Sequence, residues 1–116
     1  MLKMHELSIA QEIILAVEQE ALKRHLTTVA EIKLKIGALA GVDPESLNFG
    51  FEASTLGTPL EKTKLNIEWI NVKGKCRTCG RSISIDDLIF LCPNCDSADI
   101  EILQGEELDI EYLIAG

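Results

Sequence analysis

Four cysteines stand in two Cys-x-x-Cys pairs, which is the pattern in this chain that most clearly predicts chemistry. Cys76 and Cys79 form the first pair, and Cys92 and Cys95 form the second. Each pair places two sulfurs on one tight turn, and two such turns supply the four thiolates of a tetrahedral zinc site. A site closed by four protein ligands has no position for a substrate water, so its zinc would be structural. Disulfides are the alternative use of the four cysteines.

Two histidines are the other candidate metal ligands in the sequence. His25 follows Lys23 and Arg24 at the predicted end of a helix, where a histidine commonly stabilises carbonyl groups. His5 stands close to the start of the sequence, before an amphipathic segment. A histidine there can bind a square-planar ion such as Ni²⁺ or Cu²⁺ through its imidazole and neighbouring backbone amides. From the residues alone, a solvated terminus is the other interpretation of His5.

Composition and motifs give little support to an enzyme. All four cysteines are assigned to the metal, and the two histidines lie at opposite ends of one predicted helix, so no nucleophile has a base beside it. The formal net charge of −8 disfavours nucleic acid as the main partner. No apolar run is long enough to cross a membrane, and the start does not resemble a signal peptide. Reduced thiols then favour the cytoplasm.

Hydrophobic periodicity predicts two helices and a small sheet. Apolar residues recur at helical spacing in the first segment, whereas strict alternation marks the strands. Asp43 and Pro44 have the types expected of an N-cap and a first helical residue. The expected order is a helix from Glu6 to about Arg24, a strand over Val29–Gly37, a helix from Asp43 to about Gly57, a strand over Lys64–Val72, two very short strands between the cysteine pairs, and strands around residues 100–102 and 108–114.

The fold class that follows is α+β: a small three-stranded sheet with two helices on one face, plus an inserted zinc-ribbon-like lobe. Residues 1–73 are expected to form the first part of a nickel-binding domain, and residues 74–104 the zinc-binding domain. The lobe is too small to offer an edge to the last strand, so residues 105–116 are expected to return to the first sheet.

The order and spacing of these motifs resemble the HypA family of hydrogenase nickel-incorporation proteins over nearly the whole chain. The similarity lies in Met4-His5-Glu6-Leu7-Ser8, in Lys33-Leu34-Lys35-Ile36-Gly37, in the two cysteine pairs with Pro93-Asn94 and Asp96-Ser97, and in Gly105-Glu106-Glu107-Leu108. The resemblance implies a nickel metallochaperone for [NiFe] hydrogenase maturation. It implies Ni²⁺ bound by His5, with help from the backbone nitrogens of His5 and Glu6, and structural Zn²⁺ bound by Cys76, Cys79, Cys92 and Cys95.

The resemblance also implies partners. These are a HypB-type GTPase, the [NiFe] hydrogenase large subunit and, in some organisms, urease maturation proteins. In the family the motif usually begins at the first methionine, whereas Met1, Leu2 and Lys3 precede it here. Whether the terminal amine helps to bind nickel therefore depends on a start at Met1 or at Met4, and both stay open.

Two other functions compete with nickel delivery. Zinc ribbons with such cysteine pairs also occur in nucleic-acid-binding modules, but residues 73–96 have nearly balanced charge and a single aromatic residue, Phe90. A protein-interaction adaptor, in which His5 binds no metal, is the second alternative. The sequence leaves a homodimer open, including one formed by exchange of the last strand.

Overall fold

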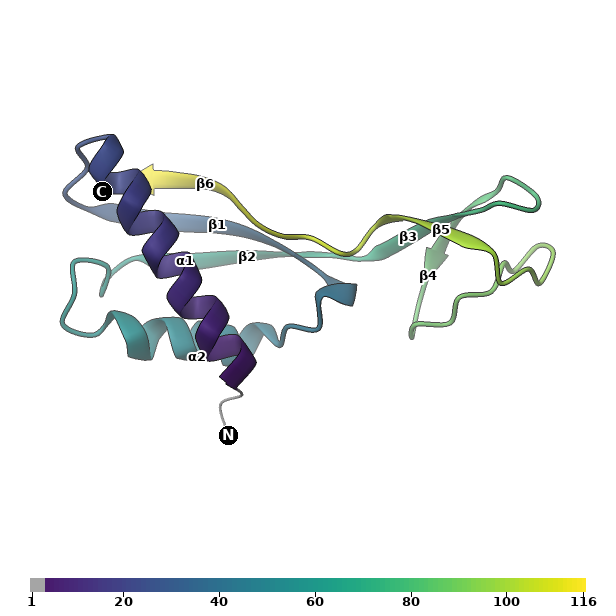
Figure 1. Cartoon of the computed structure of the whole chain (residues 1–116), viewed down its shortest axis with the longest axis horizontal. Helices are drawn as coiled ribbons and strands as arrows, with labels where there is room; N and C mark the ends of the chain where they lie inside the picture. Colours follow the sequence, from purple (N-terminus) through teal and green to yellow (C-terminus); the bar gives the residue numbers. More distant parts are fainter. Residues whose placement is uncertain (1–3) are drawn as a thin grey trace. The chain divides into compact units, whose positions relative to one another are not determined.

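The structure, a computed structural model, describes residues 4–116, so the question of a start at Met1 or Met4 falls outside the described residues. It contains two helices, one short 3₁₀ helix and six strands within this range (Figure 1). The elements are α1 (Met4–Lys23), β1 (Val29–Gly37), η1 (Ala38–Ala40), α2 (Pro44–Thr55), β2 (Lys64–Ile70), β3 (Val72–Cys76), β4 (Ser82–Ile85), β5 (Ile100–Gln104) and β6 (Leu108–Ala115). Contacts divide the chain into two compact units: the chain up to Leu34 with Val42–Glu68 and Asp109–Gly116, and Lys35–Gly41 with Trp69–Leu108.

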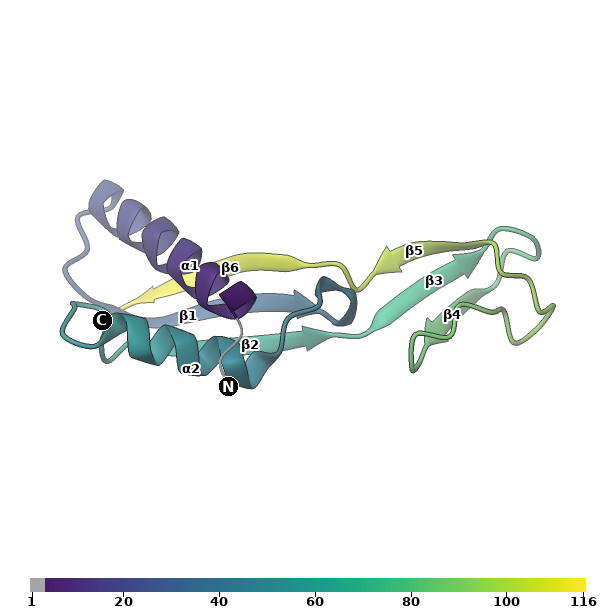
Figure 2. The ribbon, with the colours of Figure 1, turned by 60° about the horizontal axis from the view of Figure 1, so that its bottom comes forward.

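One sheet has the strand order β2-β1-β6. β1 and β2 run in the same direction and β6 runs opposite to them (Figure 2). The side chain of Asn66 donates to Glu31 at 3.3 Å, and the Lys33 amine lies 3.6 Å from the Glu68 carboxylate. These two pairs have the same offset along the chain, as parallel strands require. The helix α2 between β1 and β2 makes the long connection that a parallel pair needs.

The core of the first unit lies between this sheet and the two helices, which pack against each other. Alternate residues of β1 are fully buried, while the charged residues between them are half-buried on the other face. The helices contribute apolar side chains at helical spacing. The buried set includes Ile32 and Leu34 from β1, Ile9, Ile13 and Val17 from α1, and Leu47 and Phe51 from α2. The predicted α+β layer is therefore confirmed.

β6 returns to the first sheet, as the sequence predicts. The N–H of Gly37 donates to Glu107, and the N–H of Gly116 donates to Thr28. The two bonds are nine residues apart on both strands, so β6 pairs antiparallel to β1 with no net bulge. This register places Ile110 opposite Leu34 and Tyr112 opposite Ile32. Leu108, Ile110, Tyr112 and Ile114 thus share the helix-covered face of the sheet.

The second sheet has the order β4-β3-β5, with both pairs antiparallel. Its small core includes two of the cysteines. The buried members are Val72, Cys76, Ile83, Ile85 and Cys92, with Leu39, Phe90, Ile100 and Ile102 packed against them. Gly74 lies where β3 and β5 approach closely, because a Cβ there would lie 2.6 Å from a methyl carbon of Ile100.

Two strand predictions were wrong in detail. The strand expected over Lys64–Val72 ends at Ile70, and Val72 begins a new strand that pairs with β4 and β5. Asn71 separates them, which fits the low preference of asparagine for strands. Between the cysteine pairs only β4 forms, and residues 86–99 are turns and loops. Asp87 and Leu88 have positive φ angles of 52° and 57°, which no extended strand can contain.

Candidate metal centres

The two cysteine turns have the same backbone hydrogen bonds. In the first, Cys76 N–H donates to Arg81 and Gly80 N–H donates to Cys76. In the second, Cys92 N–H donates to Ser97 and Asp96 N–H donates to Cys92. The fifth residue of each turn has a positive φ angle, 79° at Gly80 and 59° at Asp96. Glycine adopts this conformation at no cost and aspartate tolerates it, so both turns present their sulfurs in the same way.

The four sulfurs converge on one point. All four Sγ atoms lie within 4.8 Å of one another, and none is in a disulfide. The Cys76–Cys95 and Cys79–Cys92 sulfur pairs are each 3.6 Å apart. A tetrahedron with Zn–S bonds of about 2.3 Å has edges of about 3.8 Å. The arrangement therefore fits a structural zinc ion, and the disulfide alternative is wrong.

The thiols influence one another's ionisation. The backbone N–H of Cys79 is the main cause that lowers the pKa of Cys76, to about 6. The pKa of Cys79 is also lowered, mainly by the backbone N–H of Arg81. At Cys95 the N–H of Ser97 favours the thiolate, but desolvation and the neighbouring sulfurs together raise the pKa to about 12. Four thiolates this close need a cation between them, which zinc supplies when bound.

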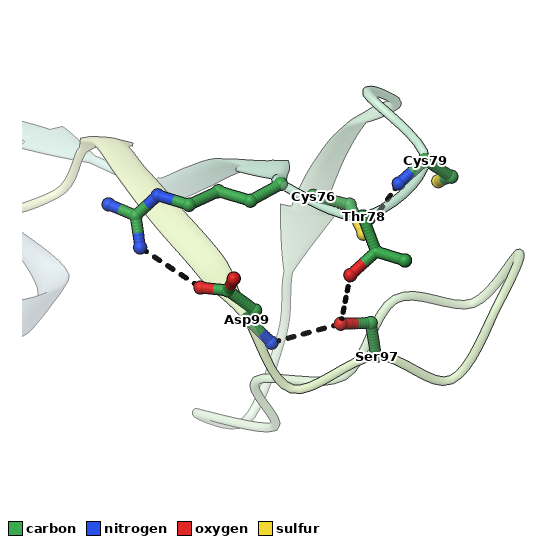
Figure 3. A network of polar contacts seen from close by, with 6 residues as sticks. Cys76, Thr78, Cys79, Ser97 and Asp99 are labelled. Atoms are coloured by element: carbon green, nitrogen blue, oxygen red, sulfur yellow. Dashed lines mark hydrogen bonds and ion pairs between the residues drawn. The ribbon is translucent and has the colours of Figure 1, made fainter.

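Polar contacts outside the sulfurs join the two turns, and no sequence pattern predicts them (Figure 3). The hydroxyls of Thr78 and Ser97 are 2.8 Å apart, one on each turn. Asp99 N–H donates to the Ser97 hydroxyl at 3.1 Å, and Arg77 donates to the Asp99 carboxylate at 3.0 Å. These residues resemble ordinary turn residues, and only the folded structure brings the two turns together.

At the other predicted site, His5 and Glu6 differ sharply. Both lie in the first turn of α1, where backbone N–H groups have no acceptor within the helix. The His5 side chain is exposed, whereas Glu6 is fully buried. Among residues 4–116, no group of three or more His, Cys, Asp or Glu side chains includes His5. His5 is therefore not part of a side-chain cluster of the kind that the four cysteines form.

The Glu6 carboxylate accepts a hydrogen bond from the backbone N–H of Asp43 at 3.0 Å. Asp43 is the N-cap of α2, with Pro44 next to it, as predicted. In a capping box this N–H is bonded by a glutamate three residues further along the same helix. Here the glutamate comes from α1 instead. Glu6 thus ties the first turn of α1 to the start of α2.

Comparison with known proteins identifies the family. The family model described as "Hydrogenase/urease nickel incorporation, metallochaperone, hypA" matches residues 4–115. The chain belongs to the HypA family. It is 41% identical over 110 residues to the hydrogenase maturation factor HypA of Desulfitobacterium hafniense (strain DSM 10664 / DCB-2), covering 95% of this chain and 96% of the relative. It is 40% identical over 111 residues to HypA of Chlorobium luteolum, covering 96% and 95%.

Solved structures of HypA proteins share the fold. The solution structure of the Ni metallochaperone HypA from Helicobacter pylori aligns with a TM-score of 0.65 at 22% identity, covering 95% of this chain and 96% of that one. A second solution structure of a HypA protein aligns with a TM-score of 0.72 at 23% identity and covers 98% of both chains. These similarities confirm the two-helix α+β architecture with a zinc-ribbon-like lobe.

Membership of the family confirms the resemblance and the general function. This HypA chain is a nickel-incorporation metallochaperone of hydrogenase maturation, and its four-cysteine cluster suits a structural zinc ion. It acts with the maturation machinery of the metalloenzyme. No helix within residues 4–116 is long and apolar enough to cross a membrane.

Proposed function

We propose that this chain binds Ni²⁺ at His5 and the backbone nitrogens of His5 and Glu6, and passes the ion on during [NiFe] hydrogenase maturation. Cys76, Cys79, Cys92 and Cys95 hold Zn²⁺, which shapes the lobe around residues 74–104. Nickel is assigned to the part made of residues 1–73 and 105–116. The observation that carries the proposal is the family match from Met4 onward, in which His5 occupies an exposed position in the first turn of α1.

Coordination chemistry supports the assignment of nickel to the amino-terminal turn. Ni²⁺ accepts nitrogen donors in a plane, and the amides of the first helical turn are not used by the helix. His5 supplies the side-chain donor at an exposed position. An exposed site with few ligands can accept an ion and release it to a partner.

The buried position of Glu6 supports a role for its backbone rather than its carboxylate. The carboxylate is engaged with Asp43 and is fully buried. This hydrogen bond fixes the first turn of α1, which contains His5, to the start of α2. The backbone amide nitrogen of Glu6 is then the ligand atom that this residue contributes to nickel.

The zinc site supports a non-enzymatic role. A cation at its centre takes four thiolate ligands, and a closed site of this kind has no open position for catalysis. Delivery instead requires partners. We assign these as a HypB-type GTPase and the [NiFe] hydrogenase large subunit in the cytoplasm, with urease maturation proteins as further partners in organisms that have them.

The test is calorimetric titration of the zinc-loaded protein with Ni²⁺. His5→Ala should weaken nickel binding by at least ~100-fold, because it removes the one side-chain donor, while zinc content and melting temperature stay unchanged. His25→Asn is the matched control, since His25 is exposed and has a φ angle of 56° that asparagine tolerates. Wild-type nickel affinity in His5→Ala would exclude the proposed site.

A further inference from the structure

The outer edge of β6 and the groove beside it form an exposed surface that nickel binding does not use. β6 is the last strand in the order β2-β1-β6, and no strand among residues 4–116 pairs with its other edge. Ile110, Tyr112 and Ile114 share the helix-covered face, yet they are 37%, 44% and 44% exposed. The helices therefore leave this part of the sheet uncovered.

A cavity of about 580 Å³ separates α1 from β6. Val17, Ala16 and Leu26 line it on one side, and residues of β6, among them Ile110, Glu111 and Tyr112, line it on the other. Glu20 and Arg24 also line it, but they form an ion pair with 2.7 Å between the Arg24 Nε and the Glu20 carboxylate. The groove thus has apolar side chains on both sides, and its two charged side chains on α1 neutralise each other.

The charged residues of β6 are all acidic. Asp109 and Glu111 alternate with the apolar residues of the strand, Glu111 also lines the groove, and β6 contains no basic residue. The charge is also strongly uneven along the chain. From residue 82 onward there are nine acidic residues and no lysine, arginine or histidine, so this region carries a net charge of −9 while residues 1–81 carry +1.

From this arrangement we propose that the free edge of β6 binds an extended segment of a partner protein in which basic and apolar residues alternate. Such a segment would add a strand to the sheet through backbone hydrogen bonds. Its apolar side chains would cover Ile110 and Tyr112 and enter the groove. Its lysine or arginine side chains would lie beside Asp109 and Glu111, because opposite charges stabilise cross-strand pairs.

A second copy of this chain is a poorer occupant. Pairing of β6 with itself would place acidic residues on the same face of both strands, and like charges opposite one another are destabilising. The same acids therefore repel a second copy and attract a basic strand. This surface goes beyond the proposed nickel role, and its test involves no metal measurement.

The probe is a ten-residue peptide of alternating lysine and valine with blocked ends, titrated into the zinc-loaded full chain at about 0.1 M salt, where distant charges are screened. We expect binding that Tyr112→Ala weakens by about tenfold. N-methylation of alternate peptide amides should abolish it, because the backbone donors are lost. Equal binding of the N-methylated peptide, or no binding of either peptide, would overturn the proposal.

A charge reversal makes the test specific. Asp109→Lys should weaken binding of the lysine peptide by about fivefold or more and allow binding of a glutamate–valine peptide. Glu52→Lys, an equal charge change at an exposed position of α2, should do neither. Sedimentation would show whether β6 instead pairs with a second copy: a wild-type dimer that Tyr112→Lys dissociates would contradict the proposal, and a monomer supports it.

Discussion

The two regions to which metals are assigned offer opposite kinds of ligand. The lobe uses four side chains from two turns with identical backbone hydrogen bonds, and its sulfurs already lie at the spacing of a tetrahedral site. The amino-terminal turn offers one exposed imidazole and backbone nitrogens. Under the proposed function, this difference lets one small chain keep one ion permanently and carry another briefly. Enclosure by folded structure favours retention, and exposure at the start of a helix favours exchange.

The interactions that hold the two sites in place differ as well. Polar contacts between Thr78, Ser97 and Asp99 join the two cysteine turns around their sulfurs. At the amino terminus a single buried carboxylate, Glu6, ties the first turn to α2 and leaves His5 exposed. The following changes test this contrast, from the largest expected effect to the smallest.

Cys79→Ser should remove the zinc ion and unfold the lobe. Cys79 is an exposed ligand, so the exchange removes a metal bond without leaving a hole in the core. Binding of structural zinc stabilises small domains by roughly 10 kcal/mol or more, so a lobe without zinc is expected to be unfolded. Zinc content should fall from about one per chain to nearly none. Trypsin should cleave after Lys75, Arg77 or Arg81 at least about tenfold faster.

The control for this change is Ser84→Ala, at an exposed position in β4. It should keep zinc and resist trypsin like the wild type. Nickel binding at His5 should persist in Cys79→Ser, since the proposed nickel ligands are unaltered. A full zinc content in Cys79→Ser, or unchanged cleavage, would show that the lobe does not depend on this metal bond.

Glu6→Ala should lower the free energy of unfolding by about 1–3 kcal/mol, because the backbone N–H of Asp43 loses its charged acceptor in a partly buried hydrogen bond. Glu6→Gln keeps an oxygen at this position and should lose less. Urea unfolding measures the stability, and nickel titration of the same variants separates anchoring from ligation. Glu6→Gln should retain nickel affinity. Loss of nickel binding in Glu6→Gln at normal stability would mean that the carboxylate itself binds the ion.

Arg77→Ala should have the smallest effect. Its ion pair with Asp99 has side chains that are 56% and 61% exposed, and such pairs contribute at most about 1 kcal/mol. We expect the zinc content to equal that of Arg81→Ala, a control at a neighbouring exposed arginine. Zinc loss in Arg77→Ala alone would show that the polar contacts outside the sulfurs help to close the metal site.

The sequence predicted the parts of the fold that have strong local patterns. Alternation defines β1 over the residues expected, and Asp43 with Pro44 marks the start of α2. Prediction failed where pairing between distant segments decides the structure. The break at Asn71 redirects the chain into a second sheet, and the apolar run from Leu88 to Leu91 forms a loop rather than a strand. The apolar character of a segment alone does not tell a continuous strand from a broken one, or a short strand from a loop.

The same distinction holds for the sites. The spacing of the cysteines was enough to predict their cluster, because each Cys-x-x-Cys pair forms a local turn. The position of His5 also followed from the sequence, although its role as a nickel ligand stays a prediction. The bond from Asp43 to Glu6 joins residues 37 positions apart, and no local pattern announces it. Contacts of this kind require the folded structure.

The most direct test of the two-metal account is metal exchange measured on a single sample. The full-length protein is loaded with Zn²⁺ and Ni²⁺, an excess of EDTA is added, and both metals are followed by native mass spectrometry over time. The account predicts that nickel leaves rapidly while one zinc ion per chain remains bound. Loss of both metals at the same rate, or retention of nickel after zinc has left, would contradict it.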